Sequence, residues 1–327
     1  MGQMPGFSQL PWTRRARVHL LGWLQSTVNR HATLVGGLAA LLPGFVASRL
    51  RASSAPLRVR RESASVDPAS VPTSSVLPSA ESPAASIVIP TYRAFAWLEA
   101  CLACVAAHTD DVAVEVIVVD DGSPSPERVA TMTEKHPGVR LVRSERNSGF
   151  AAAVNRGARE ARADVLVVLN DDVLVSPGWL STLIAVLASD ERIAWVGPAS
   201  NDTGDAATVP AHYQSFAGFL ARAEGRSGSS RDVDKLALFC AVLRRRAFDA
   251  VGGLDESYGL GMFEDDDLAQ RFRQRGQRVV LCEGVFVHHA AGATLRSLDP
   301  LAYFAQFELN RRRFEQRWGV RWRPRGG

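Results

Sequence analysis

The chain has 327 residues, of which 46% are hydrophobic and 22% charged, a composition typical of globular proteins and far from that of disordered or collagen-like chains. Its formal net charge is +4, which would suit nucleic-acid binding if the positive charges shared one surface. However, residues 1–61 carry nine arginines and no acidic residue, residues 311–327 carry seven arginines and one glutamate, and residues 62–310 keep a net charge of −11. We therefore expect no nucleic-acid partner for the central part.

Composition divides the chain into four parts. Residues 1–61 form a basic arm with an uncharged stretch at 32–48, which is marginal for a membrane span because one needs about 20 apolar residues. We interpret the arm as making peripheral contact with an anionic membrane, with a plain disordered extension as the alternative. Residues 62–85, rich in Ser, Pro and Ala, predict a linker that buries almost nothing. Residues 86–310 predict a single folded domain, and residues 311–327 a basic tail.

The four cysteines of the chain are too few for a disulfide framework at this length. Cys101 and Cys104 form a C-x-x-C pair, but the second pair of a zinc site is absent, so we expect both to pack in the interior. This cysteine usage favours a reducing, cytoplasmic location. The basic arm would hold the protein at the inner face of the cell membrane.

Residues 86–310 alternate strand and helix patterns. Apolar runs at 86–90, 114–119 and 165–169 predict buried strands, with helices between them. This repetition predicts an α/β fold, with a mainly parallel, Rossmann-like sheet flanked by helices on both faces. Ligands bind such sheets at the carboxyl ends of the strands. Two of the predicted strands end there in paired carboxylates.

The third of these strands runs directly into Asn170, Asp171 and Asp172. No G-x-G-x-x-G follows the first strand and no P-loop motif occurs, so dinucleotide and P-loop nucleotide binding lose their main support. Carboxylates this close repel each other unless a cation neutralises them, and Mg²⁺ or Mn²⁺ prefers one or two carboxylates together with phosphate oxygens. We interpret the triplet as a site for Mg²⁺ or Mn²⁺. The alternative is a solvated, Asp-rich turn.

The helix predicted after Phe263 begins with four consecutive acidic residues, Glu264 to Asp267. At 100° per residue, Glu264 and Asp265 lie within about 60° of its apolar stripe, whereas Asp266 and Asp267 lie more than about 120° away. An inward carboxylate is costly unless it has a partner or a chemical role, so Asp265 or Glu264 is a candidate general base. We expect Asp266 and Asp267 to be solvated.

A third polar group ends the apolar run 285–287, where His288 and His289 follow each other. Neighbouring residues of a strand point to opposite faces, so only one of the two can face a given site. A histidine at a strand end is usually just a hydrogen-bonded polar residue, but neutral imidazole is also a common metal ligand. Together with the acidic triplet, the pair favours one metal-ligating histidine, and the pattern leaves open which.

Seven motifs stand in order along residues 86–314. They are Ile89–Tyr92, Val118–Ser123, Arg146–Phe150 with Asn155 and Gly157, Leu169–Val173, Gly252–Glu256, Phe263–Leu268 and Val287–His289. Together they resemble family 2 glycosyltransferases of the GT-A fold, especially the rhamnosyltransferase-like bacterial enzymes that build surface polysaccharides. One such motif would be weak evidence, whereas seven in order are specific.

This resemblance implies roles for individual residues. Asp265 takes the position of the catalytic base, with Glu264 beside it. Asp172 becomes a metal ligand, with His289 as the second ligand and His288 as the alternative. The contacts to a nucleotide-sugar donor, UDP- or dTDP-linked, fall on Pro90, Thr91, Asp120, Asp121, Asn147, Gly149, Asn155, Asn170 and Asp171.

The resemblance also implies an activity. We expect an inverting, metal-dependent transfer of a sugar to a hydroxyl of a glycan or lipid-linked acceptor. One alternative, a sugar-nucleotide pyrophosphorylase, should show a glycine-rich basic loop after the first strand, where only Arg93 is found. A non-catalytic binding module would lack the acidic pair at 264–265, and a metal-dependent phosphoesterase would need more histidine ligands than the seven scattered along this chain.

Overall fold

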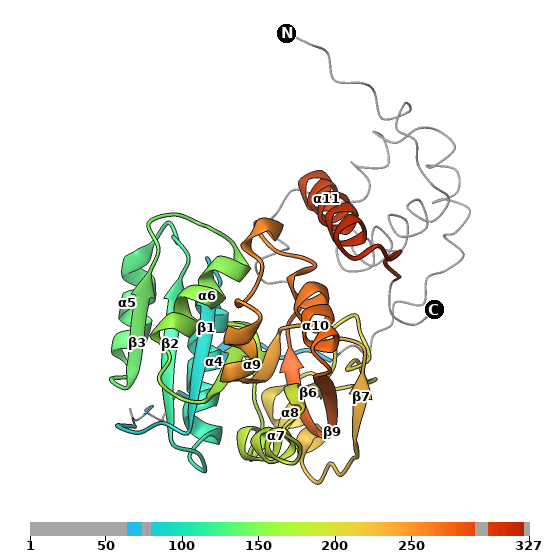
Figure 1. Ribbon diagram of the computed structural model, residues 1–327. Coiled ribbons are helices and arrows are strands. Elements are labelled where there is room, and N and C mark those ends of the chain that lie inside the picture. Colours follow the sequence, from blue (N-terminus) through green and yellow to red (C-terminus); the bar gives the residue numbers. More distant parts are fainter. Residues whose placement is uncertain (1–63, 74–76, 78–79, 292–299, 324–327) are drawn as a thin grey trace, which may run out of the picture. The chain divides into compact units, whose positions relative to one another are not determined.

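The computed structural model describes residues 64–73, 77, 80–291 and 300–323 (Figure 1). The basic arm predicted at 1–61 lies outside the described residues. Within the described ranges, no helix has both the length and the apolar character needed to cross a membrane.

The core of the fold is a nine-stranded sheet with the order β3-β2-β1-β4-β8-β6-β9-β5, in which β7 also pairs with β9. The strands are β1 (Ala85–Thr91), β2 (Val114–Asp120), β3 (Val139–Arg143), β4 (Val165–Leu169), β5 (Val173–Leu174), β6 (Ile193–Ser200), β7 (Ser230–Val233), β8 (Cys240–Arg244) and β9 (Arg278–His289). The first four strands in the chain are mutually parallel, which confirms the α/β prediction. Beyond β4 the sheet is mixed, because β8 runs antiparallel to both of its neighbours.

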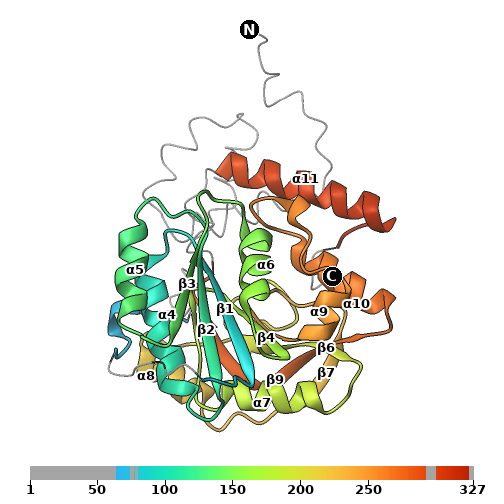
Figure 2. The same ribbon diagram turned by 60° about the vertical axis from the view of Figure 1, so that its left-hand side comes forward.

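Helices cover both faces of the sheet (Figures 1 and 2). One face packs against α4 (Phe95–His108), α5 (Pro126–Glu134), α7 (Trp179–Ala188) and α8 (Phe216–Ala223), and the other against α6 (Phe150–Glu160), α9 (Arg245–Ala250) and α10 (Glu264–Gln274). Side chains along β1 alternate between the two cores: Ile87 and Ile89 face α4, and Val88 faces α6. This alternation explains why the strand is apolar at every position. All four cysteines are buried and free, as predicted.

The described part of residues 62–85 does not behave as the expected linker. Val66, Val71 and Leu77 are at most 5% exposed and belong to the hydrophobic core. Between them the 3-10 helix η3 (Pro68–Ser70) packs against α4 and is capped by the side chain of Asp67. A Ser/Pro/Ala-rich composition indicates little to bury, but three widely spaced apolar residues suffice to attach such a segment to the domain.

Residues 311–318 belong to a helix and not to a free tail. Helix α11 (Pro300–Trp318) continues through the boundary predicted at residue 310. Phe314 is buried, Trp318 Nε1 donates to Asp267 at 3.0 Å, and Arg317 forms an ion pair with Asp255. The arginines therefore serve partly as intramolecular partners, and their charge alone did not reveal the buried face of the helix.

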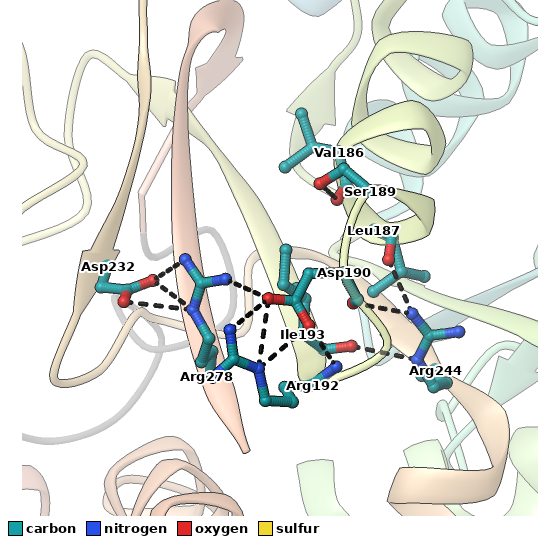
Figure 3. Close-up of polar contacts among 9 residues, drawn as sticks. All are labelled: Val186, Leu187, Ser189, Asp190, Arg192, Ile193, Asp232, Arg244 and Arg278. Atoms are coloured by element: carbon teal, nitrogen blue, oxygen red, sulfur yellow. Dashed lines mark hydrogen bonds and ion pairs between the residues drawn. The ribbon is translucent and has the colours of Figure 1, made fainter. Parts of the chain in front are cut away.

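A polar cluster holds the amino-terminal ends of β6 and β9 together (Figure 3). Asp190 accepts hydrogen bonds from Arg192 Nη2 at 2.7 Å and Arg278 Nη1 at 2.8 Å, while Arg278 also pairs with Asp232 of β7. Arg244 Nη2 donates to the carbonyl of Leu187 at 2.7 Å. Hydrogen bonds from Arg192 and Arg278 hold the pKa of Asp190 well below its ordinary value. The cluster lies at the amino-terminal ends of β6 and β9, whereas the acidic residues after β2 and β4 lie at the carboxyl ends.

Candidate active site

A pocket of about 510 Å³ opens at the carboxyl ends of the central strands. Most of the predicted site residues line it, although they come from distant parts of the chain. The structure brings together Pro90, Thr91, Asp121, Asn147, Gly149, Asn170, Asp171, Asp172, Glu264, Asp265 and His289. Asp120, Asn155 and His288 do not line it.

Several buried polar atoms of this pocket have no hydrogen-bond partner in the protein. They include Asn170 Oδ1, Asp171 Oδ2 and Glu264 Oε2. A buried polar atom without a partner costs about 1–3 kcal/mol, so native proteins rarely leave such atoms unsatisfied without a reason. Their concentration in one pocket indicates a site that a polar ligand or an ion completes.

The two carboxylates at the end of β2, Asp120 and Asp121, accept hydrogen bonds from different segments. Asp120 Oδ1 accepts from the N–H of Ser123 at 2.9 Å and shapes the turn after the strand. Asp121 accepts from the N–H groups of Ser148 and Gly149, at 3.0 and 2.8 Å. Burial raises the pKa of Asp121, and the two backbone N–H groups offset only part of that effect. Asp121 thus holds the start of α6 against the pocket.

Gly149 is a position where no other residue fits. Its φ is +94°, and a Cβ built there would lie 2.0 Å from the carbonyl oxygen of Gly259. The sequence led us to expect a close approach of the backbone to a nucleotide. In the structure the close approach is between the start of α6 and the loop that precedes α10, both of which border the pocket.

Asn155 has a structural role in this conformation. Its Nδ2 donates to the carbonyl of Leu254 and to Glu256 Oε1, both at 2.9 Å, and its Oδ1 accepts from the N–H of Leu254 at 2.8 Å. The amide oxygen and the amide nitrogen of the Asn155 side chain therefore both bind the turn that follows Gly253, at Leu254 and Glu256. Asn155 borders a second pocket, of about 580 Å³, whose lining includes four arginines and three acidic residues. The interpretation of Asn155 as a donor contact has no support from this placement.

Asp172 and His289 face each other in the pocket. His289 Nε2 lies 3.3 Å from Asp172 Oδ1, and its Nδ1 lies 2.8 Å from the carbonyl oxygen of Asp202. A carbonyl can only accept, so Nδ1 carries the proton and Nε2 faces the carboxylate. Burial lowers the pKa of His289, but the Asp172 carboxylate, the carbonyl of Asp202 and the Asp202 charge together outweigh it, and the net shift is upward.

This geometry fits a divalent cation. In the neutral imidazole the Nε2 lone pair points at a carboxylate, an arrangement that a proton or a metal ion between the two would stabilise. Burial and the Asp172 carboxylate also raise the pKa of the neighbouring Asp171 well above its ordinary value, as expected where negative charge is concentrated. Within the described ranges no set of three or more His, Cys, Asp and Glu side chains could hold a metal ion. Two protein ligands leave room for phosphate oxygens, the coordination that Mg²⁺ favours.

His288 points to the other face of β9. Its Nδ1 lies 2.8 Å from the hydroxyl of Tyr213, and its ring packs against Trp97 and Phe219. Burial lowers its pKa to about 4, so the imidazole is neutral at pH 7. His288 is a hydrogen-bonded core residue here, which corrects the alternative that it ligates the metal.

Glu264 and Asp265 both line the pocket at the start of α10. Burial, followed by the charge of Asp265, raises the pKa of Glu264 well above its ordinary value. Glu264 therefore holds its proton at a pH where an ordinary carboxyl has lost it. Asp266 forms an ion pair with Lys235. Of the acidic pair, Asp265 is thus the better candidate for an ionised base.

Asp267 is fully buried, contrary to the expectation that it is solvated. Its carboxylate accepts from Arg271 Nε at 2.7 Å and from the indole of Trp318 at 3.0 Å. The helical wheel assumed a single apolar partner surface for α10. Helix α11 covers the opposite side as well, and the carboxylate is buried there with its partners.

The turn before α10 has an unusual backbone. Met262 and Phe263 have φ values of +76° and +78°, a region that costs non-glycine residues about 1–2 kcal/mol each. Asn310 of α11, which is fully buried, holds this turn: its Nδ2 donates to the carbonyls of Tyr258, Gly261 and Met262 at 2.8, 2.9 and 3.1 Å. The left-handed turn delivers Glu264 and Asp265 to the pocket.

Sequence reasoning missed the contribution of α11 to the site. Phe307 and Trp322 line the pocket, and Asn310 supports its rim. Phe307, Phe314 and Trp318 are spaced by seven and four residues, a helical stripe that could have indicated a buried face. Asn310 lies on the same stripe, three residues after Phe307 and four before Phe314, whereas no such pattern marks Trp322.

Comparison with known proteins agrees with this fold. Residues 86–252 match the model of a family described as Glycosyl transferase family 2. An N-acetylglucosaminyl-diphospho-decaprenol L-rhamnosyltransferase of Mycobacterium tuberculosis is 31% identical over 250 residues, which cover 67% of this chain and 80% of that protein. The chain therefore belongs to glycosyl transferase family 2, and it is a glycosyltransferase.

Two further comparisons extend less far. The uncharacterised protein y4gI of Sinorhizobium fredii is 28% identical over 254 residues, covering 72% of this chain, but the chain spans only 28% of the length of that relative. A crystal structure of GalNAc-T7 with UDP, GalNAc and Mn²⁺ superposes with a TM-score of 0.51 at 18% identity, over 64% of this chain and 44% of that one. This similarity shows a shared GT-A fold.

Proposed function

We propose that the chain is an inverting, metal-dependent glycosyltransferase that moves a sugar from a UDP- or dTDP-linked donor to a hydroxyl of a glycan or lipid-linked acceptor in the synthesis of a surface polysaccharide. The observation that carries the proposal is the pocket itself. It combines the Asp172–His289 pair with a separate acidic pair, at the ends of strands where nucleotides bind in such folds.

The donor would bind at the ends of β1, β2 and β4. Thr91, Asp121 and Asn147 line the pocket there and would contact the nucleoside. Asp172 and His289 would hold Mg²⁺ or Mn²⁺ together with diphosphate oxygens. Such an ion, when bound, neutralises negative charge that develops on the departing nucleoside diphosphate. The GT-A structure that holds UDP and Mn²⁺ supports this assignment.

Asp265 would act as the general base. It removes the proton of the acceptor hydroxyl, whose oxygen forms a bond to the anomeric carbon as the bond from that carbon to the diphosphate oxygen breaks. One base on the acceptor side suffices for this single displacement, which inverts the anomeric configuration. Glu264, protonated beside it, leaves the role to one carboxylate.

We also propose action at the inner face of the cell membrane, because the mycobacterial relative is named for a decaprenol-linked acceptor. The basic arm at 1–61 would supply the contact. Deleting residues 1–61 should release the protein from anionic liposomes in a sedimentation assay while donor binding persists. Unchanged sedimentation would contradict this role of the arm.

Binding of a panel of UDP-, dTDP- and GDP-sugars, measured by calorimetry with Mn²⁺ or with EDTA, tests the donor assignment. We expect one nucleotide class to bind in Mn²⁺ only, and nucleotide release once an acceptor is added. Asp172→Ala should weaken this binding by at least about tenfold, because it removes a proposed metal ligand. Equal binding in EDTA, or no binding of any nucleotide sugar, would refute the proposal.

A further inference from the structure

The pocket has an apolar wall that takes no part in the proposed binding of the donor and the metal ion. It consists of Met262 and Phe263 before α10, with Phe307 of α11 and Trp322 after it. The rings of Phe307 and Trp322 are 5.4 Å apart and inclined by 79°, and those of Phe263 and Trp322 are 5.3 Å apart and inclined by 61°. These are the edge-to-face arrangements that aromatic groups prefer, so the wall is ordered without a ligand.

Two polar contacts fix Trp322 next to the acidic run of α10. Its backbone N–H donates to Glu315 Oε1 at 2.9 Å, and Glu315 is in turn paired with Arg311. The ammonium group of Lys235 lies 5.2 Å from the centre of the indole and also pairs with Asp266. Lys235 therefore links the indole of Trp322 to Asp266, the residue that follows the proposed base.

We propose that this aromatic wall binds a sugar ring of the acceptor. The inference rests on the proposed function, because it requires that Asp265 receive a proton from an acceptor hydroxyl. A pyranose presents a face of C–H groups that packs on an aromatic ring, and hydroxyl groups at its rim that need polar partners. The indole of Trp322 supplies the flat face, the ring of Phe307 stands nearly perpendicular to it, and Asp265 lines the same pocket.

The wall comes from a different part of the chain than the proposed donor contacts. The donor residues come from residues 90–172 and His289, whereas the wall comes from residues 262–263, 307 and 322. Leu260, which also lines the pocket, is 48% exposed and extends the apolar surface outward. Family membership does not account for the wall, because the family match ends at residue 252. Acceptor choice would thus depend on a part of the chain that carries no donor residue except His289.

Saturation-transfer NMR with the methyl β-glycosides of glucose, galactose and N-acetylglucosamine tests the proposal on the full chain with UDP and Mn²⁺. We expect at least one glycoside to bind, and Trp322→Ala to weaken that binding about tenfold or more, as truncation of a buried aromatic anchor does. Trp322→Leu keeps an apolar side chain without the flat face and should weaken it similarly. Trp322→Phe should stay within about threefold of the unaltered chain.

Trp318→Phe is the matched control, because Trp318 belongs to the same aromatic cluster but does not line the pocket. It should leave glycoside binding unchanged. The proposal fails if the unaltered chain binds none of the glycosides, or if both Trp322→Ala and Trp322→Leu bind them normally. A separate titration with UDP-sugars shows whether the donor site works. Absence of donor binding would refute the proposed function. Normal donor binding, together with normal glycoside binding by Trp322→Ala and Trp322→Leu, would refute the acceptor wall alone.

Discussion

Asp265→Asn should reduce sugar transfer by about 10²–10⁴-fold, the range that general-base catalysis contributes. The substitution preserves the size of the side chain and one accepting oxygen but removes the carboxylate that is proposed to take the acceptor proton. Donor affinity should change by less than about twofold, because the donor residues lie on other elements of the pocket. Steady-state transfer rates and donor titrations measured on the same preparation separate the two effects.

Two neighbouring substitutions serve as matched controls. Glu264→Gln should have a small effect, because the raised pKa of Glu264 already keeps its carboxyl neutral near pH 7 and glutamine resembles that form. Asp266→Asn removes the same charge one residue further along, where it is paired with Lys235. If Glu264→Gln abolished transfer and Asp265→Asn did not, the base would be Glu264.

Asn310→Ala should lower kcat by about ten- to hundredfold, a range set by the cost of misplacing a catalytic group by about 1 Å. Asn310 touches neither proposed substrate, but its amide binds three carbonyls of the turn that delivers Asp265. Without those hydrogen bonds the left-handed residues Met262 and Phe263 can relax toward ordinary backbone conformations. Donor affinity should change little, because the donor residues lie on other elements of the pocket, and this separation of kcat from donor binding defines a positioning residue.

The neighbouring residue Gln306 provides the control for that experiment. Its Nε2 donates to the carbonyl of Tyr258 alone, at 3.0 Å, so Gln306→Ala removes one bond to the same loop and spares those at Gly261 and Met262. A thermal unfolding scan should show both variants folded, with Asn310→Ala destabilised by about 1–3 kcal/mol because it leaves buried carbonyls unpaired. Equal kcat values for the two variants would show that the hydrogen bonds of Asn310 to Gly261 and Met262 have no part in catalysis.

The half of the site that depends on strand ends was predictable from the sequence. Continuous apolar runs identify β1, β2 and β4, and residues that directly follow parallel strands must share one edge of the sheet. The sequence therefore predicts that Asp121, Asp171 and Asp172 lie at one edge of the sheet. The resemblance of the seven motifs added the family, which the comparisons confirm.

The other half depends on contacts between distant segments. Which of His288 and His289 faces the pocket is decided by Tyr213, Trp97 and Phe219, which surround the first and come from unrelated parts of the chain. The burial of Asp267 is likewise decided by α11. A period of 3.6 residues describes one helix and one partner surface, so it could not foresee a second helix packing on the polar side.

The contact between Gly149 and Gly259 has a consequence for how such a protein can change its specificity. The segment that borders the donor and the loop that leads to the base touch backbone to backbone, with no room for a methyl group between them. Substitution of Gly149 is therefore blocked, whereas Phe307 and Trp322, the two wall residues that belong to or follow α11, meet no such restriction. Under the proposed role of the wall, acceptor choice can change at these two positions while the donor half of the pocket stays unaltered.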